Sequence, residues 1–146
     1  MQHPKLNFPE CFFKIREDVS GKQIFDIVRK KYVALTPEEW VRQHAIHFLI
    51  TEKKYSQGLM QVETTVKYNR MNIRCDILVY NQELKPFMLV ECKAPEIKIT
   101  QATFDQIARY NMPLRVKYLM VTNGITHYYC VMDYEKKLYT FVQDIV

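Results

Sequence analysis

Arg74-Cys-Asp-Ile-Leu-Val-Tyr80 and Pro86-Phe-Met-Leu-Val-Glu-Cys-Lys93 are the two stretches that decide the fold of this chain. Short apolar runs rich in Val, Ile and Leu are typical of buried strands. Residues 81–85 between them form a loop of hairpin length, so the two strands are expected to lie antiparallel and side by side. The sequence therefore predicts a β-hairpin inside a sheet.

Three charged residues interrupt this apolar hairpin. Glu91 and Lys93 are two positions apart, so the alternation of a strand directs both to one face and Cys92 to the other. Counting outward from the loop places Asp76 roughly opposite residues 90–92, beside Glu91. Because an unpaired charge inside an apolar sheet is costly, these groups must pair with one another or form a site.

Asp76 and Glu91 side by side favour the binding of a cation. Two carboxylates ~4 Å apart repel by about 4 kcal/mol at an effective dielectric constant of 20. The repulsion raises the pKa of one carboxylate or requires a cation. Mg²⁺ (or Mn²⁺) suits such a pair, because it accepts one or two carboxylates together with water and phosphate. Lys93 can hold or help deprotonate a water molecule, or neutralise charge that develops on a phosphate.

Two helices are expected outside this hairpin. Thr36 can cap the first, Pro37 suits its first position, and Glu39 completes a capping box, so we expect a helix from there to about residue 54. The second helix covers residues 101–110. Further strands are expected at residues 11–17, 23–26, 59–68, 116–122, 125–134 and 138–142, with Asn123-Gly124 as a hairpin signal. The order predicts an α/β (α+β) fold, a central mixed sheet flanked by helices, in one domain over residues 1–146, with N-terminal strands at 1–34 and the core at 35–142.

Composition narrows the functional classes. The chain has 146 residues, 48% apolar and 25% charged, and a formal net charge of +5 that favours an anionic partner such as nucleic acid. No apolar run is long enough to span a bilayer and no signal core follows the start, so we expect a cytoplasmic protein without membrane contact. The four cysteines, which form no CxxC pair, are expected to be free thiols: Cys11, Cys75, Cys92 and Cys130.

The arrangement Asp76…Glu91-Cys92-Lys93 resembles the PD-(D/E)xK nuclease superfamily, with Cys75 in place of the leading proline. Residues 35–43, 89–96 and 104–110 are similar to the N-terminal nuclease domain of type I restriction enzyme R subunits, and the resemblance extends over roughly residues 25–142. It implies a restriction-endonuclease-like fold and a Mg²⁺-dependent DNA endonuclease that hydrolyses phosphodiester bonds. DNA and other restriction-modification subunits are the partners that it implies.

The resemblance also implies residue roles. Asp76 and Glu91 would bind Mg²⁺, with the backbone carbonyl of Cys92 as a further ligand, and Lys93 would assist the attacking water. Glu39 corresponds to the acidic residue that such sites often take from the first helix. Gln106 and Tyr110 match a QxxxY signature and share a helical face at i and i+4. Basic residues that flank the site strands are candidate DNA contacts: Lys67, Arg70, Arg74 and Lys98.

Each of these interpretations has a structural alternative. Asp76, Glu91 and Lys93 can form a salt-bridge cluster, and Glu39 can serve only the capping box with Thr36. The whole domain can equally be a non-catalytic module that binds nucleic acid or a partner subunit. A homodimer through the terminal hairpin strands is a further alternative that the sequence leaves open.

Overall fold

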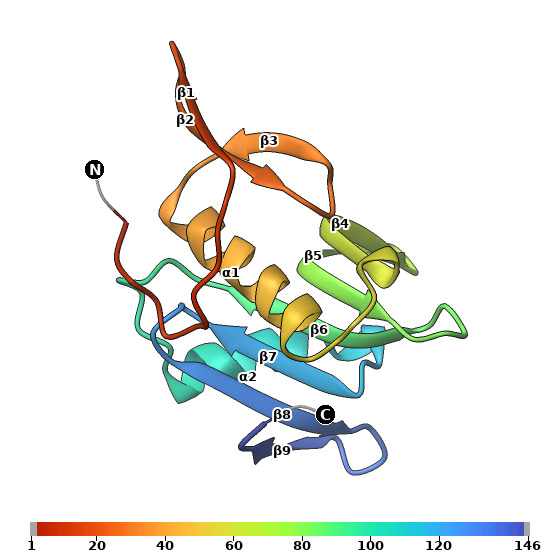
Figure 1. The fold of residues 1–146 in the computed structure, drawn as a ribbon. Coiled ribbons are helices and arrows are strands. Elements are labelled where there is room, and N and C mark those ends of the chain that lie inside the picture. Colours follow the sequence, from red (N-terminus) through yellow and green to blue (C-terminus); the bar gives the residue numbers. More distant parts are fainter. Residues whose placement is uncertain (1–2, 145–146) are drawn as a thin grey trace.

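The computed structural model describes residues 3–144, which form two sheets and two α-helices (Figure 1). Six strands form the large sheet, and every neighbouring pair is antiparallel except the parallel pair β6 and β7. The predicted central mixed sheet is therefore confirmed. Its strands, in both spatial and chain order, are β4 (Met60–Tyr68), β5 (Met71–Tyr80), β6 (Pro86–Cys92), β7 (Tyr118–Thr122), β8 (His127–Asp133) and β9 (Leu138–Val142).

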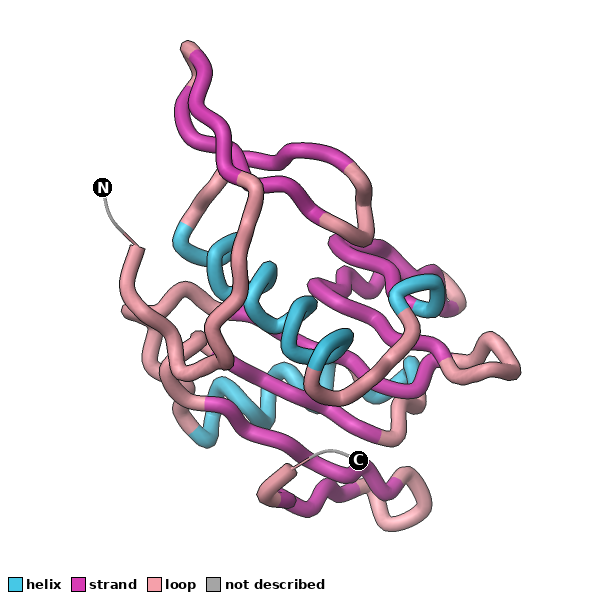
Figure 2. Tube along the Cα trace, viewed as in Figure 1, coloured by secondary structure: helices cyan, strands magenta, loops and turns pink. Residues whose placement is uncertain are grey.

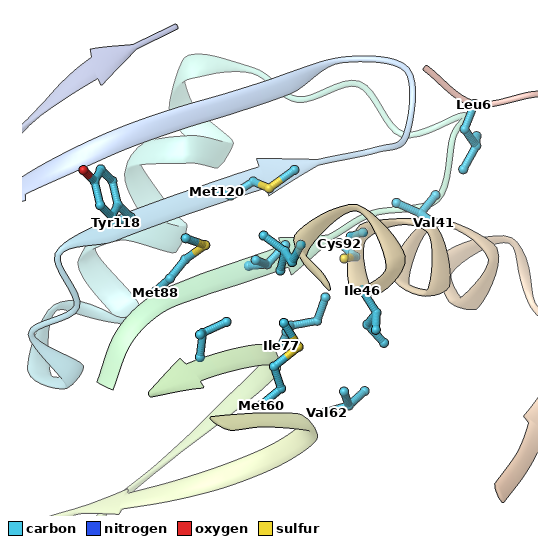
Figure 3. Packing of buried hydrophobic residues seen from close by; sticks show 14 residues of the cluster. Leu6, Val41, Ile46, Met60, Val62, Ile77, Met88, Cys92, Tyr118 and Met120 are labelled. Carbon is cyan, nitrogen blue, oxygen red and sulfur yellow. The ribbon is translucent and has the colours of Figure 1, made fainter. Parts of the chain in front are cut away.

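One helix covers each face of the large sheet (Figures 1 and 2). Helix α1 (Pro37–Thr51) packs Val41 and Ile46 against one face, where Figure 3 shows Ile46 near Cys92 and Ile77, and Val41 near Leu6. Helix α2 (Gln101–Tyr110), which connects the parallel strands β6 and β7, packs Phe104 against the opposite face. Because both faces are covered, the central strands are apolar on both sides, as the sequence of the hairpin indicates.

The ends of the elements differ from the predictions by a few residues. Helix α1 begins where expected, with the hydroxyl of Thr36 accepting a hydrogen bond from the backbone N–H of Glu39 at 3.0 Å. It ends at Thr51, three residues earlier than predicted. Strand β5 starts at Met71 rather than Arg74, because a tight turn at Asn69, whose φ is 54°, returns the chain directly along β4.

The N-terminal part of the chain forms a separate antiparallel sheet of three strands, β1 (Ile15–Asp18), β2 (Gly21–Asp26) and β3 (Lys31–Ala34). The hairpin of β1 and β2 projects from the body of the molecule in Figure 1. The turn after β2 packs on the core, because Ile27 and Val28 contact the apolar cluster beneath α1. The small sheet is therefore attached through the turn between β2 and β3, next to the first turns of α1.

The cysteines are free thiols, as predicted. Cys75, Cys92 and Cys130 are buried, and Cys11 is half-buried. Burial raises the pKa of Cys75 and that of Cys130 to about 12, so these thiols stay protonated and act as small apolar core residues.

Candidate functional site

A pocket of about 550 Å³ lies between α2 and the strands β4, β5 and β6. Three of the predicted site residues lie in its strand wall: Asp76 on β5, Glu91 on β6 and Lys93 just after β6. Gln106 and Tyr110, one helical turn apart on α2, lie in the opposite wall. The pocket thus brings together five predicted residues from three separate elements.

The pocket lies where strands β5 and β6 separate. Their ladder reaches Ile77, which pairs with Val90, and stops before Asp76. The ladder between β4 and β5 also skips one position here, the one at which Glu63 faces Asp76. Glu63 has φ 49°, a left-handed conformation that costs roughly 1–2 kcal/mol for a residue with a side chain.

Strand β5 changes face at the same position. Cys75 packs into the core on the α2 side, whereas Ile77, two residues later, packs into the core on the α1 side. A regular strand would place both on one face. Asp76 and Glu63 lie at this irregularity, and both of them line the pocket. The broken alternation therefore explains how two charged residues inside apolar strands reach the same open space.

Both carboxylate oxygens of Asp76 have partners. Oδ1 accepts a hydrogen bond from the guanidinium Nη2 of Arg42 at 2.8 Å, and Oδ2 accepts one from the backbone N–H of Cys92 at 2.7 Å. The second bond joins β5 to β6 beyond the end of their ladder. Because hydrogen bonds from a guanidinium and from a backbone N–H fix its direction, the carboxylate of Asp76 is an oriented group of the pocket wall.

The environment of Glu91 differs from that of Asp76. Its Oε1 atom is buried and has no hydrogen-bond partner. Burial first, and then the neighbouring charge of Asp76, raise the pKa of Glu91 to about 9. In the absence of a cation the pair therefore holds a proton on Glu91 at neutral pH, which is one of the two outcomes expected for adjacent carboxylates.

Lys93 and the two α2 residues complete the pocket. The backbone N–H of Lys93 donates to the carbonyl of Thr122 at 2.8 Å, which continues the pairing with β7 beyond Cys92. The side chain of Tyr110 is exposed, and its hydroxyl donates to the backbone carbonyl of Asn72 at 2.9 Å. This bond ties α2 to β5, so Tyr110 has a structural contact in addition to its place at the pocket.

Comparison with known families assigns the domain. The family model described as type I restriction enzyme R protein N terminus matches residues 37–145, which is most of the chain. This chain belongs to that family. A comparison with curated proteins gave no match. The match begins at the first residue of α1, so the R-protein segment contains the large sheet, both helices and every pocket residue, whereas the small N-terminal sheet precedes it.

Helix α1 of this R-protein domain contributes Glu38 to the pocket, and not the predicted Glu39. Glu39 is buried, and its carboxylate accepts bonds from Arg29, Arg42 and Gln43. The capping box is also incomplete, because the backbone N–H of Thr36 donates to Ala34 and not to Glu39. The two glutamates differ because successive helical residues point about 100° apart, which turns Glu39 towards the small sheet.

The residues predicted to contact nucleic acid lie at different distances from the pocket of the R-protein domain. Arg74 lines it and is exposed. Lys67 and Arg70 are exposed at the end of the hairpin of β4 and β5, and Lys98 is exposed in the loop before α2. All four side chains are available to an anionic partner, and their use in binding remains a prediction.

Two acidic residues and one arginine complete the charge pattern of the site, and sequence reasoning did not assign them. Glu38 and Glu63 line the pocket, and the buried Arg42 contacts both of them, at 3.1 Å and 3.4 Å. Burial, and then the charge of Asp76, raise the pKa of Glu38. The Glu-x-x-Arg spacing of Glu39 and Arg42 is the only local pattern in the sequence that points to Arg42. Its hydrogen bond to Asp76 cannot be read from such a pattern, because the two residues are 34 positions apart.

The donor atoms at the pocket suit a hard cation with an incomplete protein shell. Within residues 3–144 no three His, Cys, Asp or Glu side chains are grouped so that they alone could hold a metal ion. Asp76 and Glu91 still offer carboxylate oxygens, among them the unpartnered Oε1 of Glu91. Mg²⁺ needs no more than one or two carboxylates, because water and substrate phosphate supply its other ligands.

No helix in the described part of the R-protein domain has the length and apolar character needed to cross a membrane.

Proposed function

We propose that this domain is a Mg²⁺- or Mn²⁺-dependent DNA endonuclease with a PD-(D/E)xK centre formed by Asp76, Glu91 and Lys93. The observation that carries the proposal is the buried, unpartnered Oε1 of Glu91 beside the oriented carboxylate of Asp76. A buried acceptor without a partner is costly, and a divalent cation held between the two carboxylates would satisfy it. Membership of the R-protein family supports the same function.

Asp76 and Glu91 would hold the cation, with the backbone carbonyl of Cys92 as a further ligand. Glu38 takes the place on α1 that the sequence assigned to Glu39, because it lines the pocket. Binding requires Glu91 to release the proton that it holds at neutral pH. A bound cation supplies the positive charge that stabilises the attacked phosphate.

The remaining residues would act on water and DNA. Lys93 would hold the attacking water or neutralise charge on the phosphate, since it lies in the same wall as the two carboxylates. Gln106 and Tyr110 would orient the substrate from the opposite wall. Arg74 at the pocket, with Lys67, Arg70 and Lys98 farther out, would contact backbone phosphates and make binding depend on salt.

Cleavage of plasmid and linear DNA in Mg²⁺ and Mn²⁺ tests the proposal. We expect cleavage by the wild type, none by Asp76→Ala, and a loss of roughly a hundredfold or more for Lys93→Ala. Lys136→Ala, an exposed substitution in the turn between β8 and β9, should cleave like the wild type. Absence of cleavage in every condition, or cleavage by the two site variants equal to that of the wild type, would contradict the proposal.

A second candidate is a non-catalytic module that binds nucleic acid or a partner subunit. It is favoured by the contacts of Asp76, whose two oxygens already have partners in Arg42 and Cys92 without a cation. Salt-sensitive DNA binding that is unchanged by EDTA and by Glu91→Gln would support it. Mn²⁺ binding that Glu91→Gln abolishes would argue against it.

A further inference from the structure

The candidate site is connected to the small N-terminal sheet by a chain of buried and half-buried charges. Arg42 is 4% exposed and lies behind the pocket wall. Its Nη2 donates to Asp76 at 2.8 Å, and its Nη1 donates to Oε1 of Glu39 at 2.7 Å. The guanidinium therefore links the pocket carboxylate to a second carboxylate that does not reach the pocket.

Glu39 also contacts a second arginine, Arg29. Its other oxygen, Oε2, accepts from Nη2 of Arg29 at 2.9 Å and from Nε2 of Gln43 at 3.0 Å. Arg29 lies in the turn between β2 and β3. Oε1 of Glu39 thus contacts the arginine that reaches the pocket, and Oε2 contacts the arginine in the turn of the small sheet.

Asp26, the last residue of β2, anchors the far end. It is fully buried, and its Oδ1 accepts from the backbone N–H groups of Val28 and Arg29, at 2.8 Å and 2.7 Å. Its Oδ2 accepts from Nε of Arg29 and from Nε2 of Gln43, both at 2.8 Å. With four hydrogen bonds, this carboxylate fixes the guanidinium of Arg29.

The order of these groups along the chain of contacts is Asp26, Arg29, Glu39, Arg42 and Asp76, with alternating charge at every step. A buried charge holds its place because moving it leaves its neighbour unpaired. Each group therefore constrains its neighbours in the chain of contacts, and Glu63 adds a contact to both arginines, at 3.7 Å from Arg29 and 3.4 Å from Arg42. Side chains behind a metal ligand act in this way when they orient the ligand.

We propose that Asp26 and Arg29 are positioning residues, through which the small N-terminal sheet sets the orientation of Asp76. The inference rests on the proposed function for its use, because Asp76 is the proposed cation ligand. It assigns a role to the small sheet, which lies outside the segment that the R-protein family model matches. The turn that carries Arg29 also packs on the α1 core through Ile27 and Val28, so the sheet is a fixed support.

The backbone N–H of Cys92 reports on the orientation of Asp76 without any metal, because it donates to Oδ2 at 2.7 Å. Its resonance in a ¹H–¹⁵N NMR spectrum is sensitive to that bond. Arg29→Gln removes the positive charge of Arg29 from this chain of contacts. Arg29→Lys is the milder variant, which keeps the charge but loses the planar fork that contacts Asp26 and Glu39 together. Lys31→Gln is the matched control, since it makes the same charge change at an exposed position of β3.

We expect Arg29→Gln to move the Cys92 amide resonance and to weaken Mn²⁺ binding, measured by electron paramagnetic resonance, by roughly tenfold or more. Arg29→Lys should lie between it and the wild type, and Lys31→Gln should change neither. If Arg29→Gln does not fold, Arg29→Lys decides by the same two measurements. A Cys92 resonance that stays at its wild-type position in the folded Arg29 variants overturns the inference, even if their melting temperature falls. Wild-type protein that binds no Mn²⁺ would contradict the proposed function, and the Cys92 resonance would still decide whether Arg29 orients Asp76.

Discussion

Replacing Glu91 with glutamine should stabilise the metal-free protein at neutral pH. Burial and the charge of Asp76 raise the pKa of Glu91 from 4.5 to about 9, so folding at pH 7 requires this group to take up a proton. The uptake extends over two and a half pH units at about 1.4 kcal/mol each, which gives a cost of about 3 kcal/mol. The glutamine side chain has a similar shape and no charge to lose, so the variant avoids this cost.

The sign of the pH dependence follows from proton linkage. Between pH 4.5 and about 9 the folded protein binds one proton more than the unfolded chain at this group, so wild-type stability decreases as pH rises through that range. The advantage of Glu91→Gln should therefore be absent near pH 4.5, about 3 kcal/mol at pH 7, and larger at pH 8.5.

Urea denaturation of both proteins in EDTA at these three pH values measures the difference. Asp105→Asn, a carboxylate-to-amide change on α2 outside the pocket lining, is the control and should show no such trend. Addition of Mn²⁺ should then stabilise the wild type and have little effect on Glu91→Gln, because a neutral amide binds the cation much more weakly than a carboxylate. A constant difference between the two proteins at every pH would refute the reasoning.

Three further perturbations have expected outcomes. Arg42→Met should lower the free energy of unfolding by about 3–5 kcal/mol, measured in urea, because Glu39 and Asp76 both lose the buried cation that they share; a change below about 1 kcal/mol would contradict the role of this ion pair. Burial lowers the pKa of His44 and that of His127, so the unfolded chain takes up these protons first; in Glu91→Gln, which lacks the opposing titration of Glu91, stability should fall as pH drops below about 6.5; a urea midpoint of that variant equal at pH 7.5 and 5.5 would count against it. Gly124→Ala should destabilise by about 1–3 kcal/mol in thermal melts, because its φ is 86° and the new methyl group would lie 2.8 Å from a core methyl. Gly58→Ala, whose new methyl group would meet its nearest neighbour at an ordinary 3.7 Å, is the control and should be close to neutral.

The sequence predicts the arrangement of the central hairpin well, because that arrangement depends on local rules. Alternation places Glu91 and Lys93 on one side and Cys92 on the other, and in the structure Cys92 packs beneath α1 while the two charged residues line the pocket. The short loop places Asp76 next to Glu91, and the bond from the Cys92 amide to Asp76 shows this proximity. The order of the elements also predicts a mixed sheet, whereas the strand order and the parallel pair of β6 and β7 are known from the structure.

The parts that sequence reasoning does not reach depend on long-range contacts. The family resemblance points to Glu39, but the direction of a glutamate on the first turn is decided by the arginines that surround it, and one of them lies in the turn between β2 and β3. The left-handed conformation of Glu63 could not be predicted, because glycine is the residue that usually marks such a conformation in a sequence. The change of face in β5 accompanies that irregularity, so the alternation of residues in the sequence does not predict it either.

A crystal structure of the protein soaked in Mn²⁺ would show whether Asp76 and Glu91 hold a cation together. We expect an anomalous difference peak in the pocket, with carboxylate oxygens of Asp76 and Glu91 at about 2.0–2.2 Å, the range typical of small divalent cations. The same soak of Glu91→Gln should show no peak. A wild-type pocket without a peak at saturating Mn²⁺, with Asp76 still bonded to Arg42 and Cys92, would contradict this expectation and leave the cluster as a structural ion-pair network.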